Sequence, residues 1–290
     1  MIDNKIKYTL NCISQELMTK NNPILKSNNT KIDKINYLKF VMNSQKNVNK
    51  SDIIILAAGM GSRFEKLESS KCIENINSTD NILSFKVNKL QKNNLVDNIY
   101  IITGHCADLV EKAIPNKDKI TFLYNKDYNT ANNWKSLYVG IDYIKTNTAN
   151  NNDIIHMDGD LIYDDFILDL TLHSKKTSIC VDTTYSTDDE MMKVSVSNNF
   201  QVSSLRKNLS KYLGGYVGIT KIIKEDMNNI HNSLIKCKPD DYYEDGFNLY
   251  IKHYPIEIYD TFGFQWIEID TVKDLEKALD NMRNMSSRFE

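Results

Sequence analysis

Apolar runs alternate with amphipathic stretches along most of the chain from Ser51 onward. Short runs rich in β-branched and other apolar residues predict strands at residues 53–57, 98–103, 120–124, 153–157 and 178–182. Apolar positions spaced three and four apart predict helices near residues 80–93, 106–113, 132–145 and 163–173. Strands that alternate with helices are typical of βαβ units. The pattern therefore predicts an α/β fold, with a Rossmann-like mixed, mostly parallel sheet flanked by helices.

The last third of the chain carries shorter strand patterns. They predict strands at residues 192–196, 202–205, 215–219 and 256–259, and a closing helix at residues 272–282. No repeat with a period of about 20 to 50 residues is visible, which argues against a solenoid. A ligand of such a sheet is expected at the carboxyl ends of the parallel strands.

Residues 1–50 differ in character from the rest of the chain. Their apolar positions fall on two helical faces, formed by Ile6, Leu10, Ile13 and Leu17 and by Ile32, Ile35, Leu38 and Val41. We therefore expect a small helical N-terminal extension at residues 1–50, followed by one domain at residues 51–290. Two interpretations of the extension stay open: it packs on the domain as a cap, or it forms a module for dimerisation or partner binding.

Charge and cysteine content narrow the class of protein. The chain has 36 basic and 38 acidic residues, a net charge of −2, which argues against nucleic acid as a partner. Its five cysteines lie far apart without a C-x-x-C pair, which favours reduced thiols over a disulfide framework or a zinc site. The N-terminus lacks the apolar segment of a signal peptide, and no run of about 18 apolar residues occurs. We expect a cytoplasmic protein without membrane insertion.

The first predicted strand ends in a turn that is suited to bind an anion. Ile53 to Leu56 read as a strand buried on both faces, and Gly59 and Gly61 follow it directly. Glycines let the backbone turn tightly and point its N–H groups at a phosphate. No Gly-Lys-Ser/Thr follows, and the third glycine of the dinucleotide fingerprint is missing. A phosphate site that is neither a Walker A loop nor a dinucleotide loop is therefore predicted.

Two carboxylates follow the predicted strand at residues 153–157. Asp158 and Asp160 lie at its carboxyl end, on the same edge of the sheet as the glycine turn. Carboxylate oxygens beside a triphosphate suit Mg²⁺, which takes only one or two protein carboxylates and keeps several waters. In the alternative interpretation, these aspartates cap the helix that starts near Tyr163.

The segment Leu56-Ala57-Ala58-Gly59-Met60-Gly61-Ser62-Arg63-Phe64, with Lys71 downstream, resembles the signature of the sugar-nucleotide-type nucleotidyltransferases. The resemblance spans roughly residues 51–282 and implies a GT-A-like nucleotidyltransferase fold. It also implies that residues 56–63 wrap a nucleoside triphosphate whose charge Arg63 and Lys71 neutralise during catalysis. The family usually has Pro-Lys where this chain has Ser70-Lys71.

The resemblance extends to a predicted metal site. Family members end their catalytic fold with a stretch similar to Glu268-Ile269-Asp270, and they place a metal aspartate at the position of Asp160. The resemblance therefore implies Mg²⁺ bound by Asp160 and Asp270, with Asp158 near the nucleotide and Glu268 pointing elsewhere. In the alternative interpretation, Asp270 only caps the closing helix.

The segment Asn132-Asn133-Trp134-Lys135-Ser136-Leu137 resembles a segment of the phosphocholine and aminoethylphosphonate cytidylyltransferases, where it lies against the nucleotide. The resemblance implies that Asn133 and Ser136 contact the nucleotide. Amide and hydroxyl groups at a helix start can pair with a pyrimidine edge or a ribose. The alternative is that Asn132 caps the helix.

The acceptor site is predicted from the second half of the chain. A lysine ahead of a strand steadies the acceptor's phosphate in relatives, so the resemblance implies Lys193 as a catalytic and acceptor-binding residue. Aromatic faces and carboxylates can surround a cationic head group. The predicted acceptor-binding residues are Lys193, Tyr216, Tyr243, Glu244 and Trp266.

The predicted activity is transfer of CMP from CTP to a small phosphorylated or phosphonate acceptor, such as phosphocholine or 2-aminoethylphosphonate, with release of pyrophosphate. Three alternatives stay open: another pyrophosphorylase that uses UTP, GTP or dTTP, a non-catalytic nucleotide-binding regulatory module, and a glycosyltransferase of related topology. The sequence also leaves open whether the chain forms a homo-oligomer.

Overall fold

The strands of the computed structural model carry the architecture. The structure describes residues 9, 36, 38, 39, 42, 43, 45, 47–61, 70–148, 152–184 and 189–286, with side chains up to residue 280. The strands are β1 (Ser51–Ala57), β2 (Val96–Thr103), β3 (Ile120–Tyr124), β4 (Asp153–Asp158), β5 (Leu161–Tyr163), β6 (Ser178–Asp182), β7 (Lys193–Val196), β8 (Val202–Arg206), β9 (Gly214–Ile222), β10 (Glu257–Asp260) and β11 (Trp266–Glu268).

Seven α-helices have both ends within the described residues. They are α4 (Ile82–Lys92), α5 (Ala107–Lys112), α6 (Trp134–Asn147), α7 (Asp165–His173), α8 (Met227–Leu234), α9 (Tyr243–Tyr250) and α10 (Val272–Ser286). Two 3₁₀ turns, η2 (Lys71–Ile73) and η3 (Lys224–Asp226), complete the set. No described helix is both long and apolar enough to cross a membrane.

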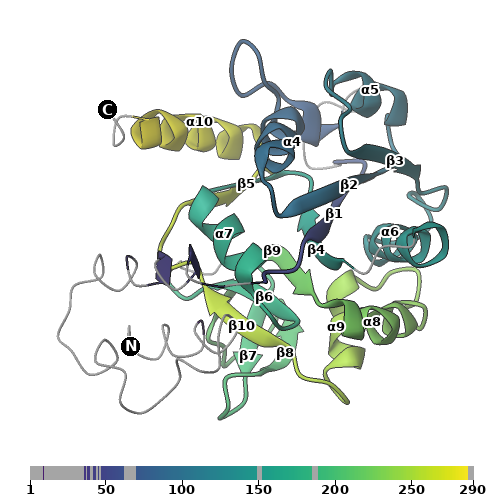
Figure 1. The fold of residues 1–290 in the computed structure, drawn as a ribbon, viewed down its shortest axis with the longest axis vertical. Helices are drawn as coiled ribbons and strands as arrows, with labels where there is room; N and C mark the ends of the chain where they lie inside the picture. Colours follow the sequence, from purple (N-terminus) through teal and green to yellow (C-terminus); the bar gives the residue numbers. More distant parts are fainter. Residues whose placement is uncertain are drawn as a thin grey trace.

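Nine of the described strands form one mixed sheet. Its main order is β10-β6-β9-β4-β1-β2-β3 (Figure 1). Strand β7 also pairs with β9, and β8 pairs with β7. Strands β3, β2, β1 and β4 run parallel, whereas β9 lies antiparallel between β4 and β6. Strands β5 and β11 form a separate antiparallel ribbon. The mixed, mostly parallel sheet that the sequence predicted is confirmed.

Helices cover both faces of the sheet because the apolar residues of the central strand alternate between them. Ile53 and Ile55 of β1 pack in one core with residues of α4, α5 and α7. Ile54 packs in the opposite core with α6, α8 and α9, which gather on one flank of the molecule (Figure 1). A strand buried on both faces needs no polar alternation, which explains the unbroken apolar run of β1. A third, smaller core joins α10 to β5.

Side-chain caps define where two of the helices begin. Asn81 Oδ1 accepts a hydrogen bond from the N–H of Ser84, and the Ser84 hydroxyl accepts one from the N–H of Asn81, so a capping box opens α4. Asp164 accepts a bond from the N–H of Phe166 at the start of α7. Asp158 is therefore not the cap of this helix.

The predicted strands and helices from residue 51 onward are present, with ends that shift by a few residues. Two helices, α8 and α9, and the short strand β5 had not been predicted. Among the apolar positions predicted for the N-terminal helices, Leu38 is described, and it is helical and fully buried against the core around β1. The other predicted positions of residues 1–50 lie outside the described residues, and the division at residue 50 stays a prediction.

A fully buried ammonium group ties β9 to the amino-terminal ends of β1 and β4. Lys221 Nζ lies 3.2 Å from Asp153 Oδ2 and donates a hydrogen bond to Ser51 Oγ at 2.7 Å. All three residues are at most 2 % exposed. Burial lowers the pKa of Lys221 and Asp153 opposes this shift. A charge in such surroundings is tolerated only when its partner stays ionised.

We expect Asp153→Asn to lower the free energy of unfolding by about 3 to 5 kcal/mol, because it leaves the Lys221 charge buried without its partner. Urea unfolding followed by circular dichroism measures the change. The double variant Asp153→Asn/Lys221→Met should lose less, since no buried charge remains. Lys50→Met, which removes a 2.9 Å ion pair from a lysine that is 55 % exposed, is the control and should cost less than about 1 kcal/mol. Equal losses in Asp153→Asn and Lys50→Met would contradict this account.

Candidate active site

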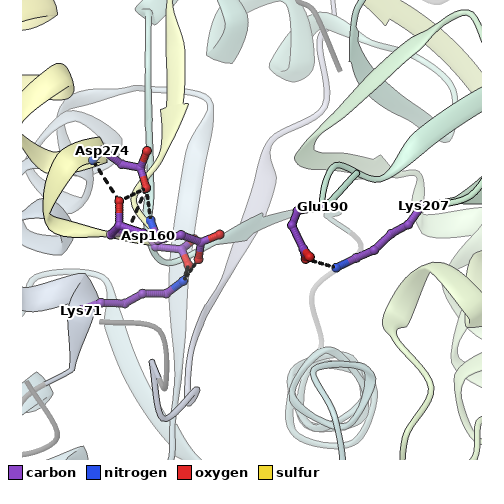
Figure 2. Close-up of polar contacts among 7 residues, drawn as sticks. Lys71, Asp160, Glu190, Lys207 and Asp274 are labelled. Atoms are coloured by element: carbon purple, nitrogen blue, oxygen red, sulfur yellow. Dashed lines mark hydrogen bonds and ion pairs between the residues drawn. The ribbon is translucent and has the colours of Figure 1, made fainter. Parts of the chain in front are cut away.

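A cavity of about 800 Å³ opens at the carboxyl ends of β1 and β4. The glycine turn after β1 and the acidic turn after β4 form one part of its wall, and the start of α9 and the turn between β8 and β9 form another. Figure 2 shows polar groups on two sides of this opening: Lys71 with Asp160 on one side, and Glu190 with Lys207 on the other. The position agrees with the expectation that ligands bind at the carboxyl edge of such a sheet.

The predicted phosphate turn forms part of the cavity lining. Its described lining residues are Leu56, Ala57, Ala58, Gly59, Met60 and Gly61. Gly61 has φ of 59°, a left-handed conformation that glycine adopts at little cost. A Cβ on Gly61 would lie 3.5 Å from Lys71 Cγ, so the stem of Lys71 packs beside the turn. The predicted nucleotide contacts Ser62 and Arg63 lie outside the described residues.

Three carboxylates converge beside this turn. One oxygen each from Asp160, Glu268 and Asp270 lies within 4.8 Å of the other two. Asp160 follows β4, whereas Glu268 and Asp270 belong to the segment that ends β11. The expectation that Glu268 points elsewhere is therefore wrong. Residues two apart in an extended segment point to the same face, which brings Glu268 to the same side as Asp270.

Lys71 joins the two aspartates that the sequence singled out. Its Nζ lies 2.5 Å from Asp160 Oδ2 (Figure 2). The same Nζ lies 2.6 Å from Asp270 Oδ1. Burial acts to lower the pKa of Lys71, but the charges of Asp160 and Asp270 outweigh burial and raise it. The group therefore stays an ammonium ion at neutral pH.

The cap of α10 is supplied by other residues. The N–H of Thr271 donates to Asp274 Oδ2 at 2.8 Å, and the N–H of Asp274 donates to Thr271 Oγ1 at 3.3 Å. These reciprocal bonds form a capping box. The carboxylate of Asp270 points instead to Lys71, so capping does not explain its place at this boundary.

The three carboxylates fit a hard divalent cation. Oxygen ligands are those that Mg²⁺ prefers. Asp160 Oδ1 is buried and has no hydrogen-bond partner among the described residues, so it remains available as a ligand. Desolvation, followed by repulsion from Asp160 and Asp270, raises the pKa of Glu268 to about 9. Because the Glu268 residue is exposed, repulsion by the two aspartates contributes more to the raised pKa than desolvation does. A cation at this site would relieve it.

Backbone contacts fix the position of Asp160. The N–H of Gly159 donates to the Leu56 carbonyl at 3.0 Å, and the Asp160 carbonyl accepts from the N–H of Ile269 at 3.0 Å. A Cβ on Gly159 would lie 2.5 Å from the Leu56 oxygen, so only glycine permits this approach. The acidic turn is thereby held against both the phosphate turn and the segment that carries Glu268 and Asp270.

The residues predicted to contact the nucleotide line the cavity, but their polar groups also hold the protein together. Asn133 Oδ1 accepts from the N–H of Tyr243 at 3.0 Å. Ser136 Oγ accepts from Asn125 Nδ2 at 3.0 Å and is 4 % exposed. Asp158 Oδ2 accepts from the Tyr243 hydroxyl at 2.9 Å. Their contact with a nucleotide stays a prediction.

Four of the five residues predicted to bind the acceptor line the cavity: Tyr216, Tyr243, Glu244 and Trp266. Trp266 Nε1 donates to Asp182 Oδ2 at 2.7 Å. Glu244 is buried, and its Oε2 has no hydrogen-bond partner among the described residues. Burial, followed by the charge of Asp158, raises the pKa of Glu244 to about 8. A buried carboxyl with a free oxygen at a cavity wall is suited to receive a donor or a cation.

The fifth residue, Lys193, lies outside this lining. Its side chain is buried, with Nζ 5.7 Å from the centre of the Tyr212 ring. Lys207 lines the cavity instead, and its Nζ lies 3.0 Å from Glu190 Oε2 (Figure 2). Lys193 pairs with Arg206 in the β7–β8 hairpin, so the two lysines are close neighbours. Sequence reasoning missed Lys207, although a lysine just after a predicted strand was a visible signal.

The comparisons with known proteins agree on the fold. A domain of unknown function (DUF6564) matches residues 67–200, and no curated protein matches the sequence. Among solved structures, a CTP:phosphocholine cytidylyltransferase from Streptococcus pneumoniae has a TM-score of 0.63 and 18% identity, covering 80% of this chain and 99% of its own. An inositol-1-phosphate CTP transferase from T. maritima has a TM-score of 0.66 and 17% identity, covering 82% and 97%.

A solved structure that is named for a uridine nucleotide matches as well. A UDP-glucose pyrophosphorylase complexed with UDP-glucose has a TM-score of 0.62 and 14% identity, covering 81% of this chain and 99% of its own. At such identities the likeness establishes the fold and leaves the substrate open. The chain has the nucleotidyltransferase fold, as its sequence predicted.

We expect Gly159→Ala to lower the free energy of unfolding by about 1 to 3 kcal/mol, because the new methyl group overlaps the Leu56 carbonyl oxygen. The urea midpoint measures the loss. Gly59→Ala is the matched control, since nothing lies within 4 Å of a Cβ at Gly59, and it should not lower stability. A Gly159→Ala protein as stable as Gly59→Ala would show that the close approach of the two turns is not constrained.

Proposed function

We propose that the protein is a Mg²⁺-dependent nucleotidyltransferase that transfers CMP from CTP to a small phosphorylated or phosphonate acceptor and releases pyrophosphate. The observation that carries this proposal is the meeting of Asp160, Glu268 and Asp270 at one cavity with the glycine turn after β1. Carboxylates that can hold a divalent cation and backbone N–H groups that can hold phosphate are the two parts that transfer of a nucleotidyl group requires.

In the proposed reaction, a phosphate or phosphonate oxygen of the acceptor forms a bond to the α-phosphorus of CTP. The bond from that phosphorus to the bridging oxygen breaks, and pyrophosphate leaves with the electron pair. The attacking oxygen is already anionic near neutral pH, so no side chain has to remove a proton. Catalysis then depends on alignment and on stabilisation of charge.

The chain's own groups divide these tasks. The turn from Leu56 to Gly61 is proposed to hold the triphosphate through its N–H groups, with Lys71 and Arg63 neutralising its charge. Asp160 and Asp270, joined by Glu268, would hold Mg²⁺, which supplies positive charge to the α-phosphate and the acceptor. Lys71 contacts both aspartates, and this contact supports a role for its ammonium group between the proposed metal site and the proposed phosphate turn.

Cytosine is the proposed base. The support is the segment from Asn132 to Leu137, which resembles cytidylyltransferases and which places Asn133 and Ser136 in the cavity wall. Two of the similar structures are named as enzymes that use CTP. Others are named for thymidine or uridine nucleotides, so the measurement of base preference has to include all four nucleoside triphosphates.

The proposed acceptor combines an anionic phosphate or phosphonate with a cationic head group. Glu244 offers a buried carboxyl oxygen without a described partner, and Tyr216, Tyr243 and Trp266 line the same cavity. An entering cation would favour the ionised form of Glu244, and aromatic faces attract cations. Lys207 is the lysine that we propose for the acceptor's phosphate, because it lines the cavity.

The test is release of pyrophosphate from each of the four nucleoside triphosphates, with phosphocholine, 2-aminoethylphosphonate or a sugar 1-phosphate as acceptor. We expect the highest rate with CTP and an amine-bearing acceptor.

Asp160→Asn should lower the rate by at least about 100- to 1,000-fold, the cost of removing one charge-stabilising group. Asp165→Asn, at an aspartate that is 70 % exposed, is the matched control and should keep its activity. An Asp160→Asn protein with the wild-type rate would refute the proposed metal site, and nucleotide binding without turnover would favour a regulatory module.

For the acceptor, we expect Lys207→Met to lower kcat/KM by about 10- to 100-fold, mostly through a higher KM, because it removes a charged contact to the phosphate. Steady-state kinetics with varied acceptor at saturating CTP measures the effect. Lys193→Met should change kcat/KM by less than about threefold, because Lys193 lies outside the cavity lining. A larger loss of kcat/KM in Lys193→Met than in Lys207→Met would contradict this proposal and favour Lys193 as the residue that binds the acceptor.

A further inference from the structure

A lysine lies on the buried side of α4. Lys86 is 2 % exposed and shares the inward face of the helix with Leu83, Val87 and Leu90. A helical position three or four residues from such apolar neighbours normally carries another apolar side chain. Burying an ammonium group there costs free energy unless nearby groups compensate. The lysine therefore requires an explanation in its surroundings.

Those surroundings are the underside of the acidic turn. Lys86 Nζ donates a hydrogen bond to the Asp158 carbonyl oxygen at 2.5 Å. The charges of Asp160 and Asp158 support the ammonium form, although burial is stronger and lowers the pKa of Lys86 to about 8. Lys86 is not among the described residues that line the cavity, so it reaches the site from behind.

Three elements thereby hold three successive residues. Lys86 of α4 binds the carbonyl of Asp158, the Leu56 carbonyl of β1 binds the N–H of Gly159, and the N–H of Ile269 binds the carbonyl of Asp160. The bonds from β1 and from Ile269 are formed by main-chain atoms and do not depend on the side chains of Leu56 and Ile269. The bond from α4 depends on one side chain.

We propose that Lys86 is a positioning residue that holds the turn of Asp158, Gly159 and Asp160 in the geometry needed for binding of a divalent cation. The inference rests on the proposed function, since it concerns the cation site of Asp160, Glu268 and Asp270. Lys86 acts through the Asp158 carbonyl and touches neither substrate nor metal. Groups that orient metal ligands from behind typically change metal affinity by about 10- to 100-fold when they are removed.

The direction of the change separates this role from a purely electrostatic one. If Lys86 acted only as a nearby positive charge, its removal would strengthen binding of a cation, because a repulsive charge would be lost. If Lys86 holds the turn, its removal weakens binding, because Asp160 is no longer fixed beside Glu268 and Asp270. The two roles predict opposite signs for the same substitution.

The experiment measures binding of Mn²⁺ alone to the full chain, by titration calorimetry or by the electron paramagnetic resonance signal of free Mn²⁺. Lys86→Met should bind Mn²⁺ about 10- to 100-fold more weakly than wild type. Lys86→Gln retains an N–H donor on a side chain one atom shorter, so its affinity should lie between those of wild type and Lys86→Met. Lys89→Met is the matched control on the same helix, because Lys89 is partly exposed and pairs with Asp165 at 2.7 Å; its affinity should equal that of wild type.

Circular dichroism and urea unfolding identify variants that fail to fold. If Lys86→Met does not fold, Lys86→Gln carries the test, and it should bind Mn²⁺ more weakly than Lys89→Met. Affinity in either folded Lys86 variant equal to or tighter than that of wild type would overturn the positioning role while leaving the proposed function intact. Failure of the wild-type chain to bind Mn²⁺ would overturn both.

Discussion

The hydrogen bond from the Gly159 N–H to the Leu56 carbonyl joins the two turns on which the candidate site depends. One turn carries the glycines after β1, and the other carries Asp160. Parallel pairing of β1 with β4 brings both turns to the same edge of the sheet, and the missing side chain of Gly159 allows them to touch. The spacing between the glycine turn and the acidic turn is thereby set by the sheet, whose core residues are buried.

The charges around this contact are balanced by two lysines of different kinds. Asp158, Asp160, Glu268 and Asp270 bring four carboxyl groups into one region, which would repel one another strongly without compensation. Lys71 compensates from inside the cavity and bridges two of the carboxylates, whereas Lys86 compensates from the protein core. Four carboxyl groups face two ammonium groups, so acidic groups remain in excess in this region. Residual negative potential of this kind attracts divalent cations.

Much of the fold could be predicted from the sequence because the central strands are buried on both faces. Such strands appear as unbroken apolar runs, and those of β1 and β4 led directly to the glycine turn and to Asp160. Helices α8 and α9 escaped prediction because each is only eight residues long. Met227, Ile230 and Leu234 of α8 do share one buried face, but two turns of helix give a weak pattern. Both helices pack against α6, and α9 also packs against β8.

The site was harder to predict where side-chain direction decides the outcome. Glu268 had been expected to point elsewhere, yet it shares a face with Asp270 once the segment is extended. The choice between Lys193 and Lys207 depends on the register of the β7–β8 hairpin, which one sequence does not reveal. Lys86 was visible as a lysine on an apolar helix face, but its partner is a backbone carbonyl 72 residues away, which no local pattern can indicate.

The antiparallel direction of β9 divides the site into two regions with separate origins. Because β9 runs against β4, its beginning and not its end reaches the cavity, with Gly218 beside the Asp158 carboxylate. One region is therefore lined by segments that follow parallel strands, whereas Tyr216 belongs to β9 itself and Lys207 to the turn between β8 and β9. Insertions or deletions in that turn can remodel the second region without disturbing the glycine turn and the acidic turn, which would give a fold of this kind a route to new ligands during evolution.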